Sequence, residues 1–162
     1  MTELRPLELP GDAAPLTEIY NHYVLHSTAT FETVPLTVAQ MTERLAASYF
    51  ALTAVDSDGR VVGYGALHAY RPRFDRVAEA TCYLAPEAVG EGLGARILDL
   101  LVDAARRRGD LTGVIACINE TNLPSRRLVE SRGFRRVGRY PDVAVKFSAP
   151  LTDLDYLLPL CL

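Results

Sequence analysis

The chain has 162 residues, of which 49% are hydrophobic and 23% are charged, and its formal net charge is -3. Because this length is typical of one domain with a sizeable core, we expect a single domain over residues 1–162. The slightly acidic balance argues against a nucleic-acid partner, which requires clustered Lys and Arg. There is neither an apolar run long enough to span a bilayer nor a leader-like N-terminus. We therefore expect a cytoplasmic protein with no membrane partner.

The first fifty residues predict one strand followed by two helices. Residues 4–9 alternate apolar and polar side chains up to a Pro-Gly turn, as a strand does. Asp12 is placed to cap a first helix, and Thr37, with Gln40 in capping-box position, opens a second one. The stripe of the first helix comprises Leu16, Ile19, Tyr20, Tyr23 and Val24. Residues 26–32 lack helical periodicity and are expected to form a loop that lines a pocket.

The next segments predict three strands. Residues 49–55 and 60–69 flank the turn 56–59, which is a strong hairpin signal. Residues 77–84 form a further strand that leads into a glycine-rich loop. A helix with apolar residues at helical spacing follows the loop and ends at Gly109.

The last third of the chain predicts three strands and one helix. Residues 113–118 are nearly all apolar, which is typical of a strand buried on both faces in mid-sheet. Asn122 begins a helix that ends at Gly133, and residues 134–147 and 153–160 complete the chain as strands. The predicted order is therefore β-α-α-β-β-β-α-β-α-β-β.

Three glycines, Gly90, Gly92 and Gly94, stand at alternate positions between a strand and a helix. Such glycines let the backbone approach a ligand, while the helix start adds unpaired N–H groups and a positive dipole end. The loop therefore predicts a binding site for a pyrophosphate. The same residues satisfy the loose dinucleotide pattern G-x-G-x-x-G/A, but that fold needs the loop after its first strand and an acidic residue about 20 positions on. A glycine-rich turn without a ligand is the remaining alternative.

The three cysteines, Cys82, Cys117 and Cys161, are odd in number, and each lies in an apolar stretch. Their spacing fits no zinc-binding pattern. We expect buried free thiols and no metal.

The order of elements and several motifs resemble the GNAT superfamily of N-acetyltransferases, which bind acetyl-CoA in a loop of this kind. A closer similarity, to the phosphinothricin acetyltransferase branch, rests on residues 19–24, 27–32, 70–73, 79–84 and 122–134. The resemblance implies an α/β (α+β) fold class, with a mixed, mostly antiparallel sheet of about seven strands flanked by four helices. It also implies acetylation of the α-amino group of phosphinothricin, methionine sulfoximine or methionine sulfone, and a homodimer.

The resemblance further implies two binding regions for acetyl-CoA. Cys82, Tyr83 and Leu84 present backbone groups to the pantetheine arm. The pyrophosphate is wrapped by the loop residues Gly90, Glu91, Gly92, Leu93, Gly94 and Ala95. Asn122 matches a family asparagine that contacts CoA, although a plain helix cap is an equally good interpretation.

Glu79 is the residue we expect to act as the base. An ammonium substrate must lose a proton before its nitrogen attacks the thioester, and a glutamate stands at this position in the branch. An exposed strand residue or half of a salt bridge is the alternative. The N–H of Leu84 is our candidate for stabilising the charge that develops on the carbonyl oxygen.

Four residues are expected on the acceptor side. Arg71 and Arg73 carry guanidinium groups whose geometry matches carboxylate or phosphinate oxygens, although surface salt bridges are the alternative. Phe31 and Lys146 match further pocket positions in the branch.

The chain departs from the family pattern at three places. Val89 and Glu91 stand where the loop usually has Arg or Gln, and Glu91 would repel a pyrophosphate unless its side chain turns outward. Val129 replaces the Tyr or His thought to protonate the departing thiolate, and no Trp follows Lys146. These departures leave two alternatives open, an acetyl-CoA-binding module with little turnover and an acetyltransferase for a peptide or protein amine.

Overall fold

Seven strands form one sheet in the order β1-β2-β3-β4-β5-β7-β6. The structure is a computed structural model and describes residues 1–160. The strands are β1 (Glu3–Pro6), β2 (Phe50–Val55), β3 (Val61–Ala69), β4 (Val77–Leu84), β5 (Gly113–Asn119), β6 (Arg135–Lys146) and β7 (Ala149–Pro159). All neighbouring pairs are antiparallel except β4 and β5, which are parallel. The mixed, mostly antiparallel sheet and the predicted order of elements are therefore confirmed.

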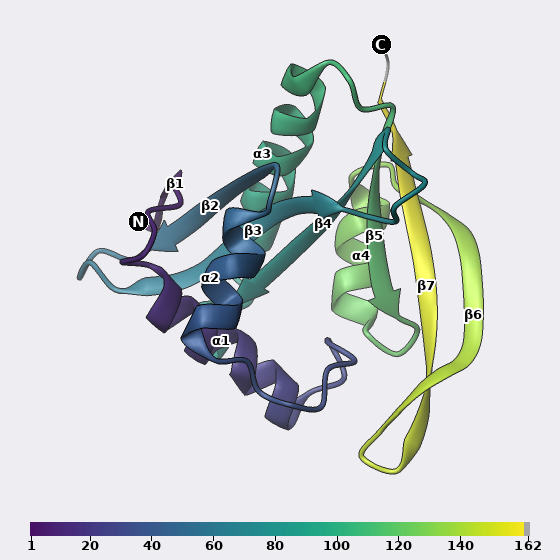
Figure 1. The fold of residues 1–162 in the computed structure, drawn as a ribbon, viewed down its shortest axis with the longest axis horizontal. Helices are drawn as coiled ribbons and strands as arrows, with labels where there is room; N and C mark the ends of the chain where they lie inside the picture. The colour runs from purple at the N-terminus through teal and green to yellow at the C-terminus, as the bar shows by residue number, and fades with distance from the viewer. Residues whose placement is uncertain (161–162) are drawn as a thin grey trace.

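Four α-helices cover the two faces of the sheet, two on each face (Figure 1). They are α1 (Ala13–His26), α2 (Val38–Ala46), α3 (Leu93–Arg108) and α4 (Leu123–Ser131), and a short 3-10 helix, η1 (Pro86–Ala88), precedes α3. Helices α1 and α2 lie on one face, while α3 and α4 lie on the other (Figure 1). Within residues 1–160, no helix is both long and apolar enough to cross a membrane.

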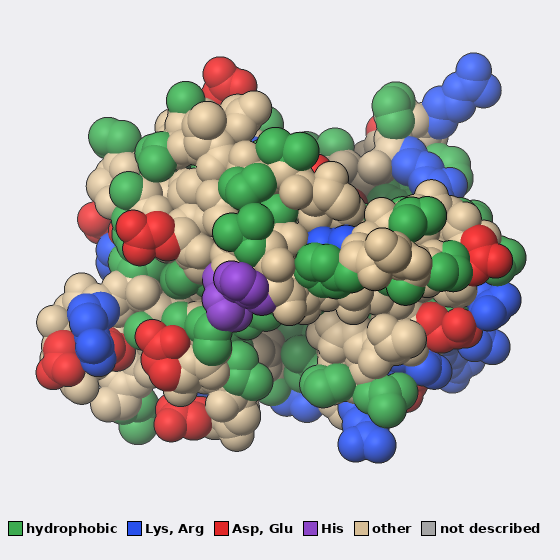
Figure 2. All heavy atoms as spheres, turned by 90° about the horizontal axis from the view of Figure 1, so that it is seen from below, with side chains coloured by type: hydrophobic (Ala, Val, Ile, Leu, Met, Phe, Trp, Pro, Cys, Tyr) green, Lys and Arg blue, Asp and Glu red, His purple; other side chains and the backbone are tan. Residues whose placement is uncertain are grey.

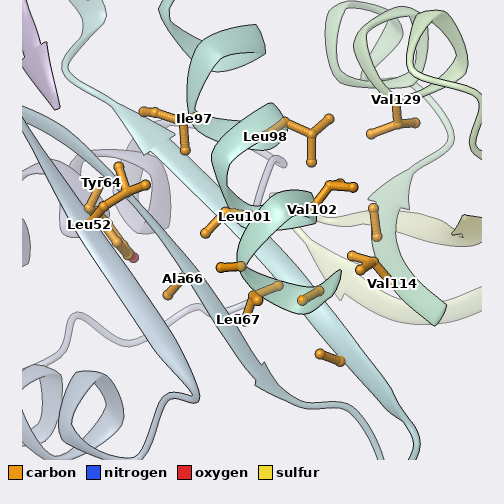
Figure 3. Packing of buried hydrophobic residues seen from close by; sticks show 14 of the residues in the cluster. Leu52, Tyr64, Ala66, Leu67, Ile97, Leu98, Leu101, Val102, Val114 and Val129 are labelled. Carbon is orange, nitrogen blue, oxygen red and sulfur yellow. The ribbon is translucent and has the colours of Figure 1, made fainter. Parts of the chain in front are cut away.

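Helix α3 packs closely on the sheet. Its residues Ile97, Leu98 and Leu101 are almost completely buried and point toward the strands in the hydrophobic core (Figure 3). A Cβ atom added to Gly65 of β3 would lie 2.3 Å from Cγ2 of Ile97, so the glycine is what allows the helix to come this close. Burial of each such side chain contributes about 1.5–3 kcal/mol to stability. This packing holds the start of α3, and the glycine loop before it, in place against β4.

The caps of α2 and α4 agree with the sequence prediction, but that of α1 does not. The side chains of Thr37 and Asn122 accept hydrogen bonds from the backbone of their own helices. Asp12 makes no capping bond and lies in the right-handed helical region itself. Its carboxylate instead accepts two hydrogen bonds of 2.8 Å from Arg5 and one of 2.9 Å from Thr53. A bidentate bond to a guanidinium is stronger than a helix cap, so the tertiary partners prevail.

Strand boundaries differ from the prediction mainly at the chain ends. Strand β1 ends at Pro6 rather than at residue 9, because residues 9–12 form a turn. Strand β7 begins at Ala149, four residues before the predicted start at 153, because it pairs with β6 from Ala149 onward. Cys82 and Cys117 are free, partly buried thiols, whereas Cys161 lies outside the described residues.

Strands β4 and β5 separate after a short paired segment, and this positions the site. Their parallel pairing covers only residues 77–79 of β4 and 113–115 of β5. Beyond it, β5 continues beside β7 up to Asn119, while β4 continues beside β3 up to Leu84. Figure 1 shows the carboxyl ends of β4 and β5 diverging. The gap exposes backbone groups of β4 that a fully paired strand would bury.

Candidate active site

Two cavities meet at the middle of β4. The first, of about 580 Å³, lies on the side of α1 and α2, and the second, of about 700 Å³, extends through the gap between β4 and β5. Glu79, Thr81 and Tyr83 border both cavities. Figure 2 looks at the molecule from the side on which β4 and β5 separate, where hydrophobic and uncharged groups surround a recess near the middle. Two ligands that reach the middle of β4 from these cavities can therefore meet at Glu79.

The second cavity collects nearly all residues predicted to bind acetyl-CoA. It is lined by Cys82, Tyr83, Leu84, Gly90, Gly92, Leu93, Gly94, Ala95 and Asn122. Glu91 is the exception, since it is exposed and does not line the cavity. Val89 does line it, at a position where the resemblance predicts Arg or Gln. The repulsion expected from Glu91 is therefore reduced by its outward position.

The glycine loop has the geometry of an anion-binding cradle. Gly90 and Gly92 have φ angles of +98° and +75°, and a Cβ atom added to either would meet nothing within 4 Å. Gly92 is the residue before α3, so the free N–H groups of the first helical turn begin immediately after it. Both the open space and the helix start fit a pyrophosphate.

The backbone of Leu84 faces the gap. The N–H of Ala85 donates a hydrogen bond of 2.8 Å to the carbonyl of Val62 on β3. Since backbone direction alternates along an antiparallel strand, the N–H and C=O of Leu84 point away from β3. The carbonyl accepts a 2.5 Å hydrogen bond from the hydroxyl of Tyr23. The N–H is left directed at the second cavity, where it can donate to a ligand.

Glu79 is a partly buried carboxylate between the cavities, paired in register with His68 on β3. Burial raises its pKa above the ordinary value, and the charge of Asp153 raises it further. Asp153 borders the first cavity on β7, and burial together with Asp155 raises the pKa of Asp153 to about 6. Two carboxylates with raised pKa values beside one cavity are well suited to accept a proton near neutral pH.

Arg71 and Arg73 lie outside the two cavities described above. Neither residue lines either of them, and both are exposed. Arg71 forms a 3.6 Å ion pair with Asp155 and lies 4.7 Å from the ring centroid of Tyr70. Tyr70 also donates a 2.5 Å hydrogen bond to Asp155. The structure therefore places Arg71 outside the lining of both cavities, and the predicted contacts of Arg71 and Arg73 with substrate stay predictions.

The two other residues predicted on the acceptor side differ in position. Phe31 lines the first cavity. Lys146 is buried and lines neither cavity, and its ammonium donates to the carbonyls of Tyr23 at 3.2 Å and Thr30 at 2.8 Å. Lys146 thus holds the segment after α1, which contributes lining residues, against the C-terminal hairpin.

Val129 on α4 is buried and borders the second cavity. The position where the resemblance predicts a proton donor therefore borders this cavity but is apolar here. The hydroxyl groups of Tyr23 and Tyr83 belong to the only phenols that border this cavity within residues 1–160.

The described residues contain one group with metal-ligating atoms close together. Atoms of Cys117, Asp153 and Asp155 lie within 4.8 Å of one another. Burial raises the pKa of the Cys117 thiol well above its usual range, which opposes the thiolate form that metals require. Cys117 and Asp153 of this group line the first cavity, whereas Asp155 does not.

Sequence reasoning missed several lining residues. Arg44, His68 and Asp153 border the first cavity but form no sequence motif with Glu79. Tyr23 was predicted only as part of the apolar stripe of α1. Strand pairing brings His68 and Asp153 toward Glu79, through the register pairs His68 with Glu79 and Asn119 with Asp153. Such pairing is not readable from one sequence.

The glycine loop and the unpaired edge of β4 suit an anionic ligand that runs along this strand. The family model of the acetyltransferase (GNAT) family matches residues 16–134. The chain is 36% identical to a phosphinothricin N-acetyltransferase of Streptomyces coelicolor over 144 residues, which is 84% of either chain. It is also 36% identical to an L-methionine sulfoximine/L-methionine sulfone acetyltransferase of Salmonella typhimurium, over 91% of this chain and 88% of the relative.

A solved structure agrees with these relatives. The phosphinothricin acetyltransferase of Sinorhizobium meliloti, determined in complex with acetyl-CoA, superimposes with a TM-score of 0.93 at 31% identity, over 98% of this chain and 88% of that one. The chain therefore belongs to the acetyltransferase (GNAT) family. The resemblance predicted from the sequence is confirmed, and the protein is an N-acetyltransferase.

Proposed function

We propose that this protein transfers the acetyl group of acetyl-CoA to the α-amino group of a small amino acid or analogue, of the phosphinothricin, methionine sulfoximine or methionine sulfone type. The observation that carries this proposal is the position of Glu79, which borders both cavities. Relatives that acetylate these compounds, at 36% identity, support the substrate class. A homodimer, which the resemblance implies, and a cytoplasmic location, which the composition predicts, are part of the same proposal.

Acetyl-CoA fits the second cavity in two respects. The cradle around Gly90 and Gly92 and the start of α3 suit the pyrophosphate. The unpaired backbone edge of β4 near Leu84 suits the amide-rich pantetheine arm, which can add to a strand as a peptide does. Acetyl-CoA supplies the activated thioester, and the chain supplies its position.

The chemistry assigned to the chain has two parts. Glu79 takes a proton from the acceptor ammonium, directly or through water, so that the nitrogen can attack the thioester carbonyl. The N–H of Leu84 stabilises the negative charge that develops on the carbonyl oxygen. When the carbon–sulfur bond breaks, a thiolate with a pKa of about 8.5 leaves, and it takes its proton from water or from the acceptor nitrogen.

A second candidate function is a module that binds acetyl-CoA with little turnover. Val129 favours it, because this side chain has no proton to give to the thiolate. A third candidate function is acetylation of peptide or protein amines. Assays with a panel of acceptors distinguish the three candidate functions.

The test is release of the CoA thiol with methionine sulfone, methionine sulfoximine, phosphinothricin, spermidine and a lysine-containing peptide. We expect release with amino acid analogues and none with spermidine or the peptide. If acetyl-CoA raises the melting temperature but no acceptor gives release, the binding module is the better description. Release with the peptide alone would contradict the proposed acceptor class.

A further inference from the structure

The charges that line the first cavity are unequal. Glu32, Glu79 and Asp153 contribute three carboxylates. Within residues 1–160, Arg44 is the one Lys or Arg that lines this cavity. His68 lines it as well, but burial and then the charge of Arg44 lower its pKa, so it is uncharged at neutral pH.

Arg44 lies in the last turn of α2, and its guanidinium is loosely held. Its one ion pair, with Glu32, spans 3.4 Å between side chains that are 36% and 48% exposed. The guanidinium carbon lies 5.1 Å from the centroid of the Tyr20 ring. Stacking on a ring fixes the plane of a guanidinium but leaves its in-plane N–H donors free for a ligand. Arg44 can therefore form a bidentate bond to a carboxylate in the cavity.

Two other cations near the first cavity do not line it. Arg71 pairs with Asp155 and lies outside the cavity lining. Lys146 donates to the carbonyls of Tyr23 and Thr30. A ligand in the first cavity thus meets one permanent positive charge, that of Arg44. It also meets the carboxylates of Glu32, Glu79 and Asp153.

We propose that Arg44 binds the α-carboxylate of the acceptor, and that the first cavity therefore selects amino acids with uncharged side chains over phosphinothricin. This inference rests on the proposed function and narrows its substrate class. An amino acid acceptor offers an ammonium to Glu79 and a carboxylate to Arg44. Phosphinothricin adds a negatively charged phosphinate, which meets carboxylates and no second permanent cation in the lining. Methionine sulfone has a side chain of similar length with two uncharged acceptor oxygens.

The test crosses protein variants with acceptors. The acceptors are methionine sulfone, phosphinothricin and 3-(methylsulfonyl)propylamine, which is methionine sulfone without its carboxylate. For the wild type we expect a kcat/KM at least about 10-fold higher with methionine sulfone than with phosphinothricin. Arg44→Ala should lose about 10- to 100-fold in kcat/KM with methionine sulfone, mainly through KM, and less than about 3-fold with the propylamine. Arg44→Lys should fall between them, since it restores charge without the planar fork.

Arg108→Ala is a matched control. Arg108 also stacks on a tyrosine ring, 4.3 Å from the centroid of Tyr49, and also pairs with a carboxylate, that of Asp110 at 2.8 Å. It lines neither cavity, so its removal should leave the acceptor preference unchanged. Equal losses with methionine sulfone and the propylamine in Arg44→Ala, or a wild type that prefers phosphinothricin, would overturn the inference.

Calorimetric titration of methionine sulfone into the CoA-saturated protein separates this inference from the proposed function. Binding to the wild type without any turnover would contradict the proposed function alone. Equal binding to the wild type and to Arg44→Ala would contradict the role of Arg44, whether or not the protein turns over.

Discussion

The hydroxyl of Tyr23 donates a 2.5 Å hydrogen bond to the carbonyl oxygen of Leu84, and so joins the last turns of α1 to the end of β4. The carbonyl of Tyr23 in turn accepts a hydrogen bond from Lys146 at the end of β6. The backbone of Leu84, whose N–H faces the second cavity, is thus held by two hydrogen bonds in series. They run from Lys146 in the C-terminal hairpin to Tyr23 of α1, and from Tyr23 to Leu84. If Leu84 N–H is the oxyanion donor, as proposed, residues remote from the thioester position it.

Tyr23→Phe removes that hydrogen bond while keeping the ring. We expect a loss of about 1 kcal/mol in the free energy of unfolding and a fall in kcat that exceeds the change in KM for acetyl-CoA. Steady-state kinetics and denaturant unfolding measure both. Tyr156→Phe is the control, because Tyr156 bonds Arg126 and Glu130 but lines neither cavity. If both variants lose kcat equally, the Tyr23 bond serves only stability.

Glu79→Gln keeps the shape of the side chain and removes its basicity. We expect kcat at neutral pH to fall about 10²- to 10⁴-fold, the usual contribution of a general base. The affinity for acetyl-CoA should persist, as measured by calorimetry. Glu43→Gln, on the exposed face of α2, is the control and should leave kcat unchanged. Unaltered turnover of Glu79→Gln would remove this residue from the mechanism.

The pH profile of kcat/KM should report the pair Glu79 and Asp153. Because both pKa values are raised, that of Asp153 to about 6, activity should fall as the pH drops through this region and the base becomes protonated. Asp153→Asn removes a like charge next to Glu79, so the acid limb should move to lower pH. A limb that does not move would mean that Asp153 has no electrostatic influence on the base.

The same substitution predicts a pH-dependent change in stability. The pKa of Asp153 is higher in the folded protein than its ordinary value, so folding favours the protonated carboxyl. Its favourable contribution is complete below the unfolded pKa and is lost as the pH rises through about 6. Asp153→Asn should therefore raise the melting temperature at pH about 7.5, with the gain disappearing toward pH about 4. A gain that is equal at both pH values would contradict the raised pKa.

Gly92→Ala tests the anion-binding loop. Gly92 and Gly109 flank α3 with the same φ of +75° and open space around the missing Cβ, so Ala at either position should cost about 1–2 kcal/mol of stability. Only Gly92 borders the second cavity, so only Gly92→Ala should raise KM for acetyl-CoA. Equal KM values for the two variants would argue that the loop does not hold the donor.

Much of the fold was readable from the sequence because its signals are local. The capping box at Thr37, the apolar run of β5 and the alternate glycines at the start of α3 each depend on residues a few positions apart, and each appears in the structure as predicted. Asp12 shows that a prediction from local sequence fails when a side chain has partners outside its own segment. Its side chain is of a type that often caps helices, but its carboxylate accepts hydrogen bonds from Arg5 and Thr53 instead. Thr53 belongs to β2, which comes much later in the chain.

The sequence by itself determined the order of elements, and it predicted an anion-binding loop and Glu79 as the base. Only the tertiary structure decided which side chains line the first cavity, where the acceptor is proposed to bind. Glu79, Asp153 and Arg44 come from β4, β7 and α2, and nothing in their spacing marks them as neighbours. Strand register brings the two carboxylates together, while packing of α2 on the sheet brings Arg44 to the same cavity. Local periodicity specifies backbone conformation and burial, but the convergence of side chains depends on register and helix packing between distant segments.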